Sequence, residues 1–192
     1  MRAFVRQLRP AVVVLVAMTV LCGFVYPMVV TAVTQVAFHD KANGSLVKHN
    51  GKSVGSSFLG QTFVGSQWFH SRPSAAGAGY DAMASSGSNL GPLNPDFLES
   101  VAKRVATYRS ENGLAAGASV PVDAVTASAS GLDPHISVAN ALLQAPRIAA
   151  ARKIEESVVL RAIEGATSSP ALGFLGDGGV NVLRANLALD EG

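Results

Sequence analysis

The feature that most constrains this chain is an uncharged stretch of 27 residues close to its N-terminus. From Ala11 to Ala37 there is no Asp, Glu, Lys, Arg or His, and Val, Leu, Ala and Met dominate. A helix rises about 1.5 Å per residue, so this stretch is longer than the roughly 30 Å hydrocarbon layer of a bilayer. We therefore predict one transmembrane helix over residues 11–37.

A cleaved signal peptide is the main alternative, and it fits the sequence less well. Signal peptides have a short apolar run followed by small residues at a cleavage site. Here the apolar run continues beyond residue 30 without an A-x-A pattern. A lipid anchor on Cys22 would need a small residue before the cysteine, and Leu21 stands there. The sequence favours a retained span.

The charges that flank the span predict its orientation. Arg2, Arg6 and Arg9 precede it with no acid among them, and the positive-inside rule places such a segment in the cytoplasm. Residues 1–10 are therefore predicted to be cytoplasmic. Residues 38–192 are predicted to form a periplasmic, or extracytoplasmic, domain of a single-pass protein in the cell inner (plasma) membrane.

The predicted outer domain has no strong charge and no disulfide. From residue 40 onward the chain carries 12 of the 15 Lys and Arg and all 13 Asp and Glu, a net charge of 12 − 13 = −1. Such a surface lacks the basic field that binds nucleic acid. Cys22 is the single cysteine and lies within the span, so the domain must be stabilised by packing alone.

Pro27 lies in the middle of the span, where it removes one backbone hydrogen bond and favours a kink. Thr19, Thr31, Thr34 and Gln35 add polar groups at membrane depth. These residues fit an ordinary helix, and they equally suit a span that hydrogen-bonds to partner helices.

Hydrophobic periodicity and turn residues predict a compact mixed α/β (α+β) domain after the span. The segment 40–56 is predicted to form turns joining short strands, and 74–89, rich in Ala, Gly and Ser, a loop. Asn94-Pro95-Asp96 predicts a helix start, with Gly113 at its end. The remaining predictions are a strand at 121–128, a helix capped by Ser137 that Pro146 closes or restarts, a helix from about Ile154 to Gly165, and a strand at 180–189.

The short catalytic motifs in the chain are weak. Gly51-Lys52-Ser53 matches the end of a phosphate-binding loop, but the glycine required five residues before Gly51 is Leu46. Gly51-x-Ser53-x-Gly55 also fits a nucleophile elbow, yet it lies in a charged turn. A hydrolase using Ser53 or His135 is the enzyme alternative that these residues leave open.

Asp133-Pro134-His135 allows two interpretations. It places a carboxylate beside an imidazole, as acid/base chemistry requires, or it forms a turn capped by Asp133. We favour the turn. The four histidines are not spaced for a shared helical metal site, and no metal is predicted to bind. The residues thus predict a binding or assembly subunit rather than an enzyme.

Many ordered blocks give the chain a resemblance to one family over almost its whole length. They are Tyr26-Pro27 with Thr31, Ala42-Asn43-Gly44-Ser45-Leu46, Gly55-Ser56 with Leu59-Gly60-Gln61, Phe69-His70 with Arg72-Pro73-Ser74-Ala75, Ser88-Asn89-Leu90, Asn94-Pro95, Pro121-Val122, Val125-Thr126-Ala127-Ser128, Ser130-Gly131-Leu132-Asp133, Gln144 with Pro146-Arg147, and Asn186-Leu187-Ala188-Leu189-Asp190. In these blocks the chain resembles the KdpC family, the C chain of the ATP-driven, high-affinity bacterial potassium transporter.

The resemblance implies an accessory, non-catalytic subunit of a potassium import complex. Its implied partners are a channel-like potassium-binding chain, a P-type ATPase chain and a small single-helix chain, together with membrane lipid. The family is described as a catalytic chaperone that raises the ATP affinity of the ATPase chain. The implied ATP-binding residues are Ser128, Ser130, Gly131 and Gln144.

The predicted topology argues against nucleotide binding and favours a structural role. The 128–131 segment would lie outside the membrane, away from cytoplasmic ATP, and it shows no amide cradle after a core strand. The alternative function is docking on the outer face of the channel-like chain. We predict Trp68, Phe69, Arg72 and Pro27 as interface residues, because aromatic residues and arginines anchor interfaces, although core packing explains Trp68 and Phe69 equally well.

Two serines depart from the family pattern, which has glycine after His70 and before Gly87. Ser71 and Ser86 stand there in this chain. If those positions require positive φ angles, the serines strain the backbone and change the shape of the loop.

Overall fold

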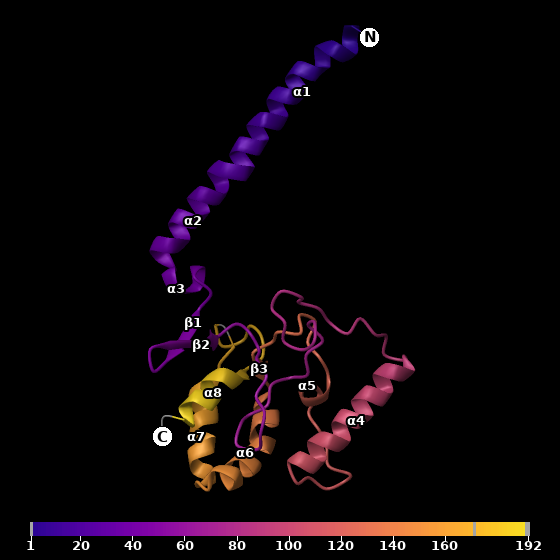
Figure 1. Cartoon of the computed structure of the whole chain (residues 1–192), viewed down its shortest axis with the longest axis vertical. Helices are drawn as coiled ribbons and strands as arrows, with labels where there is room; N and C mark the ends of the chain where they lie inside the picture. Colours follow the sequence, from indigo (N-terminus) through magenta and orange to yellow (C-terminus); the bar gives the residue numbers. More distant parts are fainter. Residues whose placement is uncertain (1, 171, 191–192) are drawn as a thin grey trace. The chain divides into compact units, whose positions relative to one another are not determined.

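A computed structural model describes residues 2–170 and 172–190 and divides the chain into two units, Met1–Leu46 and Val47–Gly192. The first unit is one long helix with a short helical turn after it, and the second is the folded domain (Figure 1). The predicted class, a single N-terminal apolar helix followed by a mixed α/β domain, is confirmed.

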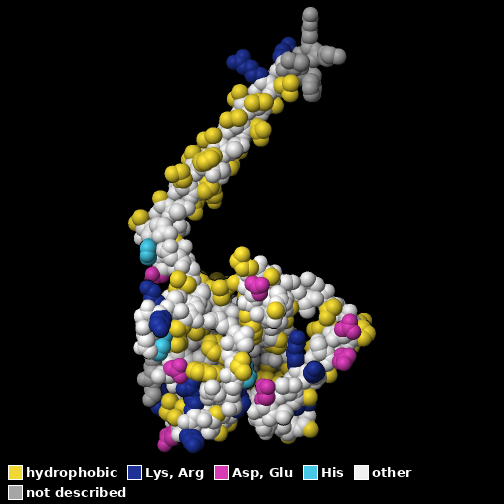
Figure 2. All heavy atoms as spheres, viewed as in Figure 1, with side chains coloured by type: hydrophobic (Ala, Val, Ile, Leu, Met, Phe, Trp, Pro, Cys, Tyr) yellow, Lys and Arg dark blue, Asp and Glu magenta, His cyan; other side chains and the backbone are white. Residues whose placement is uncertain are grey.

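The long helix runs through α1 (Arg2–Val20), the π-helical turn η1 (Leu21–Val25) and α2 (Tyr26–Ala37), and α3 (His39–Ala42) follows. Arg6–Ala37 is long and apolar enough to cross a membrane, and all of its hydrophobic side chains are exposed. Figure 2 shows hydrophobic side chains along the helix and basic ones near its N-terminal end. The helix begins at Arg2 and so includes residues of the segment predicted to be cytoplasmic.

Pro27 is accommodated by the π-helical turn that precedes it. Proline has no N–H and its ring crowds the carbonyl one turn earlier, so a regular α-helix is disturbed there. The N–H of Tyr26 instead reaches back to the oxygen of Leu21, which widens this turn. The hydroxyls of Thr19 and Thr34 donate to carbonyls of their own helix, at 2.8 and 2.9 Å, and so are satisfied within it.

The domain begins with the strands β1 (Leu46–His49) and β2 (Lys52–Ser56), which pair as a hairpin. Asn50 and Gly51 join them with φ angles of 50° and 77°. Two positive φ angles are what a two-residue hairpin turn needs, and Asn-Gly is the pair that adopts them most readily. The predicted turns and short strands are confirmed, with α3 as an unpredicted helical turn.

Three helices and a small sheet build the core. The helices are α6 (Val138–Arg152), α7 (Glu156–Ala166) and α8 (Val182–Ala188). The sheet contains β3 (His135–Ile136), β4 (Thr167–Ser168) and β5 (Gly179–Asn181), with β5 central and antiparallel to both neighbours. Ile136 and Thr167 both pair with Val180, which is fully buried. The helices therefore pack around the strand that comes last in the chain.

Helix α4 (Pro95–Glu111) lies beside this core, and α5 (Val122–Val125) follows it (Figure 1). Asn94 caps α4 as predicted, because its side-chain oxygen accepts from the N–H groups of Asp96 and Phe97. Ser137 caps α6 in the same manner through the N–H of Asn140. Helix α6 continues through the exposed Pro146 instead of ending or restarting there.

Two predicted strands are wrong. Residues 121–128 contain α5, whose Val125 is buried and whose Asp123 accepts from the N–H and the hydroxyl of Ser137. Residues 180–189 contain the last two residues of β5 and then α8, which Asn181 caps by accepting from the N–H of Arg184. In both segments tertiary contacts outweigh strand propensity, and in 180–189 the Asn181 cap also favours the helix.

Residues 57–94 contain no helix or strand, which confirms the loop predicted at 74–89. This irregular segment nevertheless includes fully buried side chains, those of Phe69 and Ala76. Its backbone must therefore be held by partners outside regular secondary structure.

Candidate functional site

Gln144 is the family-implied nucleotide residue, and the fold uses it to hold the backbone of His70. Its side chain is 1% exposed on α6. Its oxygen accepts from the His70 N–H at 2.8 Å and from Arg147 Nη2 at 2.9 Å. Its nitrogen donates to the His70 carbonyl at 3.3 Å and to Asn140 Oδ1 at 2.9 Å. These four bonds use the whole capacity of a primary amide.

Asn140, one turn earlier on α6, extends this buried network. Tyr108 of α4 donates its hydroxyl to Asn140 Oδ1 at 2.8 Å, and Asn140 Nδ2 donates to Asp123 at 2.9 Å. Burial, and then the nearby charge of Asp123, raises the pKa of Tyr108 far above its ordinary value, against a smaller lowering by Arg147. The network thus links α4, α5 and α6, with the amides of Asn140 and Gln144 at its centre and the charged Asp123 and Arg147 at its ends.

Phe69 is held from the other side by Asn186 of α8. The Phe69 N–H donates to Asn186 Oδ1 at 2.8 Å, and Asn186 Nδ2 donates to the Phe69 carbonyl at 3.0 Å. The Phe69 side chain is fully buried in the core. Two consecutive residues, Phe69 and His70, are therefore each bound at the N–H and the carbonyl by an amide side chain from a different helix.

The segment 128–131 supports the 74–89 loop. Ser130 offers its carbonyl to the N–H of Ser86 and to the hydroxyl of Ser85, both at 3.0 Å. Ser74 donates its hydroxyl to the Gly131 carbonyl at 2.6 Å and accepts from the Tyr80 N–H at 2.8 Å. The serines and glycine that the family resemblance assigns to ATP thus lie at the base of a loop.

Gly131 is required at this base for steric reasons. It is buried with a φ angle of 66°, and a Cβ there would lie 2.7 Å from the Ala76 nitrogen and 2.7 Å from the Ser86 oxygen. Both neighbours are backbone atoms, which cannot turn aside. Only glycine allows the backbone at Ala76 and at Ser86, on the two sides of the loop, to approach this segment so closely.

The predicted interface residues Trp68 and Arg72 also make contacts within the domain. The guanidinium of Arg152 lies 4.4 Å from the centre of the Trp68 ring. Arg72 donates to Asp133 Oδ2 at 3.0 Å, and the backbone carbonyl of Arg72 accepts from the hydroxyl of Tyr80. Together with the buried Phe69, these residues fix the chain just before the loop.

Asp133 forms the turn that we favoured. Its Oδ1 accepts from the His135 N–H at 2.9 Å, and the His135 ring nitrogen Nδ1 lies 3.7 Å from the same oxygen. Burial acts to raise the pKa of Asp133, but hydrogen bonds from His135 and Arg72 outweigh it, so the pKa lies below its ordinary value. The carboxylate is therefore held charged as a structural partner of Arg72.

The departures at Ser71 and Ser86 cause no backbone strain, since neither residue has a positive φ angle. Ser71 donates its hydroxyl to the Gln61 carbonyl at 2.9 Å. Loop residues with positive φ angles are Gly77, Gly79, Tyr80 and Asn89. The condition for strain, a positive φ angle at Ser71 or Ser86, is therefore not met.

A cavity of about 450 Å³ lies between α4 and α6. Its lining includes Lys103, Arg104, Tyr108, Asn140, Gln144 and His70. Ser128, Ser130 and Gly131 are not among the residues that line it. The four residues implied for ATP are therefore not gathered around this space.

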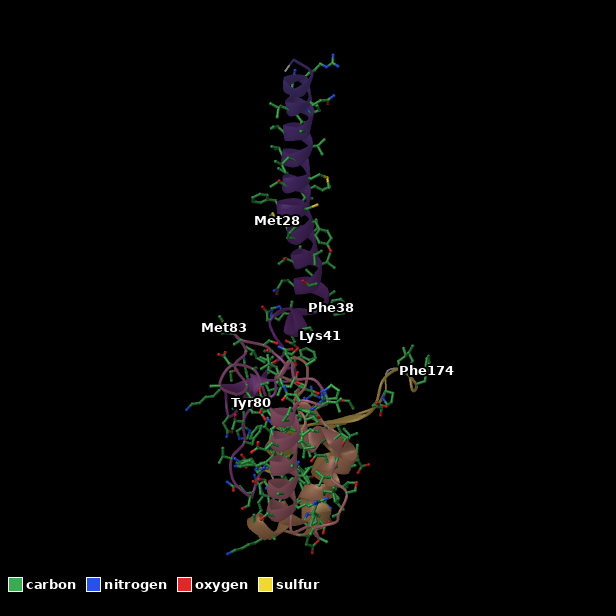
Figure 3. All side chains as sticks on the ribbon, turned by 90° about the vertical axis from the view of Figure 1, so that its right-hand side faces the viewer. Met28, Phe38, Lys41, Tyr80, Met83 and Phe174 are labelled. Carbon is green, nitrogen blue, oxygen red and sulfur yellow. The ribbon has the colours of Figure 1, made fainter. Side chains whose placement is uncertain are left out.

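The loop presents large apolar side chains to solvent. Met83 is 96% exposed at its tip, and Leu93, just after the loop, is 87% exposed. Leu90 between them is 41% exposed. Figure 3 shows Met83 and Tyr80 on the same side of the domain. We call Met83, Leu90 and Leu93 the loop surface. The sequence predicts the loop but not these residues, although each is a large apolar residue among small or polar ones and proline.

The structure thus defines a class of protein, a small mixed α/β domain carried by one helix that is apolar and long enough to cross a membrane. Comparison with known proteins gives the family. The family model described as "KdpC: K+-transporting ATPase, c chain" matches residues 8–191. The chain belongs to this family.

Similar relatives share the name potassium-transporting ATPase KdpC subunit. The protein of Mycobacterium tuberculosis (strain H37Rv) is 58% identical over 186 residues, covering 97% of this chain and 98% of its own length. That of Caulobacter vibrioides is 53% identical over 185 residues, covering 96% and 92%. That of Beijerinckia indica is 50% identical over 185 residues, covering 96% and 93%. The chain is therefore a KdpC-type subunit of a potassium-transporting ATPase.

Proposed function

We propose that this subunit acts in assembly, and that its domain docks on the channel-like potassium-binding chain of the complex through the loop surface. The helix packs beside the helices of that chain, with the small single-helix chain and the P-type ATPase chain as the other members. In this proposal the N-terminus is cytoplasmic and the domain is extracytoplasmic.

The observation that carries the proposal is a loop that is held in place while its apolar residues are exposed. The segment 128–131 and Arg72 bind the loop at its base. An interface that is ordered before binding loses little conformational entropy on association. Exposed Met and Leu side chains on an ordered loop are the kind of surface that a protein partner buries.

Raising the ATP affinity of the ATPase chain is the second candidate function. The cavity between α4 and α6 supports it, because Lys103 and Arg104 give this space two cations. Gln144 is already saturated by internal bonds. Of the four residues that the resemblance implies, only Gln144 lines the cavity, so the nucleotide role rests on the cavity and its two cations.

Co-purification tests the docking role. Changing Met83 and Leu93 to Asp places two carboxylates in the proposed contact, so we expect the domain to be lost from the complex while it stays folded. Leu160→Asp, at a 40% exposed position on α7, is the matched control and should leave the complex intact. If the double variant co-purifies with the complex at the wild-type level, the docking proposal is wrong.

Nucleotide binding is tested separately. The full chain in lipid nanodiscs is titrated calorimetrically with ATP, and the KM for ATP of the complex is compared with that of a Lys103→Ala variant. Direct binding together with a raised KM would favour the second candidate. Absence of binding, with loss of the complex in the Met83 and Leu93 variant, would favour assembly.

A further inference from the structure

A second group of exposed apolar side chains lies on the loop between β4 and β5. Leu172 is 82% exposed, Phe174 is 75% exposed and Leu175 is 52% exposed. Gly173 and Gly176 have φ angles of 80° and 84°, so the backbone turns sharply beside each of these side chains. Figure 3 shows Phe174 on a loop that projects away from the rest of the domain.

This projection is distinct from the loop surface. In Figure 3 Phe174 and Met83 project to opposite sides of the domain. One flat partner surface therefore does not cover both. The apolar part of the projection, Ser168 to Gly176, carries no charge, and the one charged residue of the loop is the exposed Asp177 that follows it. The projection therefore offers a protein partner little charge with which to fix its register.

The base of the projection is close to the point at which the membrane-proximal chain joins the domain. The carbonyl of Ser57, the first residue after β2, accepts from Asn181 Nδ2 at 2.9 Å. Asn181 is the last residue of β5, and the projecting loop ends at the first residue of this strand, Gly179. A strand of three residues is about 10 Å long. The end of the projecting loop at Gly179 therefore lies within about 10 Å of Asn181, which binds Ser57.

With the apolar helix in the bilayer, as in the proposed function on which this inference rests, the length of the connecting chain limits how far this part of the domain can lie from the lipid. Nine residues, 38–46, connect the end of the apolar helix to the end of the β1–β2 hairpin that adjoins it. Nine fully extended residues reach at most about 30 Å. A tether of this length keeps the effective concentration of the lipid surface high at the base of the projection.

We propose that Leu172, Phe174 and Leu175 insert into the lipid interface and give the domain a second, reversible contact with the membrane. Apolar side chains at a tethered surface gain free energy by leaving water for the boundary of headgroups and acyl chains. Since the projection has no cation, insertion depends on apolar burial and not on anionic lipid.

Tryptophan fluorescence of the full chain in phosphatidylcholine nanodiscs, without partner chains, tests this contact. In a Trp68→Phe background, Phe174→Trp reports on the loop. Ala116→Trp reports on the exposed segment after α4, at the end of the domain remote from the β1–β2 hairpin (Figure 1). We expect a blue-shifted emission and quenching by brominated lipid at position 174, and neither effect at position 116.

A second variant separates loop insertion from an effect of the probe. Leu172→Asp with Leu175→Asp, added to the position 174 reporter, should abolish the blue shift and the quenching while the circular dichroism spectrum stays unchanged. The proposal is overturned if position 174 is as exposed to water as position 116, or if the quenching survives the two aspartates. It is also overturned if position 174 becomes shielded only after partner chains are added, because the occupant is then a protein.

Discussion

Gln144 binds both backbone polar groups of one residue: its oxygen accepts from the His70 N–H at 2.8 Å, and its nitrogen donates to the His70 carbonyl at 3.3 Å. Two bonds of this kind imitate the pairing of a neighbouring strand. They allow the chain to cross the domain without a sheet, so a residue of nucleotide-site type serves as a structural clamp.

We predict that Gln144→Glu destabilises the domain. A carboxylate replaces the donor that faces two acceptors, the His70 carbonyl and Asn140 Oδ1. Leaving such buried groups unsatisfied costs about 1–3 kcal/mol each, and a denaturant titration of the full chain in detergent measures it. Gln61→Glu, which loses one exposed bond to the Val54 carbonyl, is the control. Equal denaturation midpoints for the Gln144 and Gln61 variants would contradict the role of Gln144 as a clamp.

We expect Gly131→Ala to loosen the 74–89 loop. The new methyl group would lie 2.7 Å from two backbone atoms at a φ angle of 66°, so the loop must shift. Hydrogen exchange of the Ser86 amide, which donates to Ser130, should accelerate. Gly117→Ala is the control, since a Cβ there meets nothing within 4 Å. Unchanged exchange in the Gly131 variant would contradict the supporting role of this segment.

Acid should selectively weaken the Arg72–Asp133 contact. Because the folded pKa of Asp133 is below its unfolded value of about 3.9, its contribution to stability is present above that value and is lost as the pH falls through the folded pKa. Asp133→Asn should therefore be less stable than wild type at about pH 6, and the difference should shrink toward pH ~2. Unfolding midpoints across this range give the comparison, with the exposed Asp177→Asn as control. A difference independent of pH would exclude the ionic contribution.

Pro27→Ala should convert the π-helical turn into regular α-helix. The restored N–H at residue 27 can bond to the carbonyl four residues earlier, and removing an interior proline stabilises a helix by about 3 kcal/mol. Backbone chemical shifts of residues 21–26 in nanodiscs, by solid-state NMR, report the change. Pro10→Ala, within the uninterrupted α1, should leave these shifts as they are. If Pro27→Ala also leaves them unchanged, the proline does not cause the turn.

Local signals predicted part of the fold well. The uncharged 27 residues, the Asn94 cap and the Asn50-Gly51 turn depend on neighbours in sequence, and the structure confirms the helix, the cap and the turn. The strand predicted at 180–189 failed because alternating apolar residues there also fit a helix. Asn181 was the available sign of that helix, since Asn is a strong N-cap residue.

The support of the candidate site could not be predicted, because its contacts span long distances in sequence. Asn186 binds Phe69 across 117 residues, and Gln144 binds His70 across 74. Nothing local to Gln144 indicates whether its amide is saturated or free. The resemblance implies a nucleotide role for Gln144, and the structure shows which bonds its amide makes.

The central strand of the sheet, β5, and the helix that holds Phe69, α8, follow every other described element of the core in sequence. During synthesis these two elements leave the ribosome after the rest of the core. The domain therefore cannot complete its fold until α8 has been made. Deletion of α8 is expected to give an unfolded product that is open to proteases.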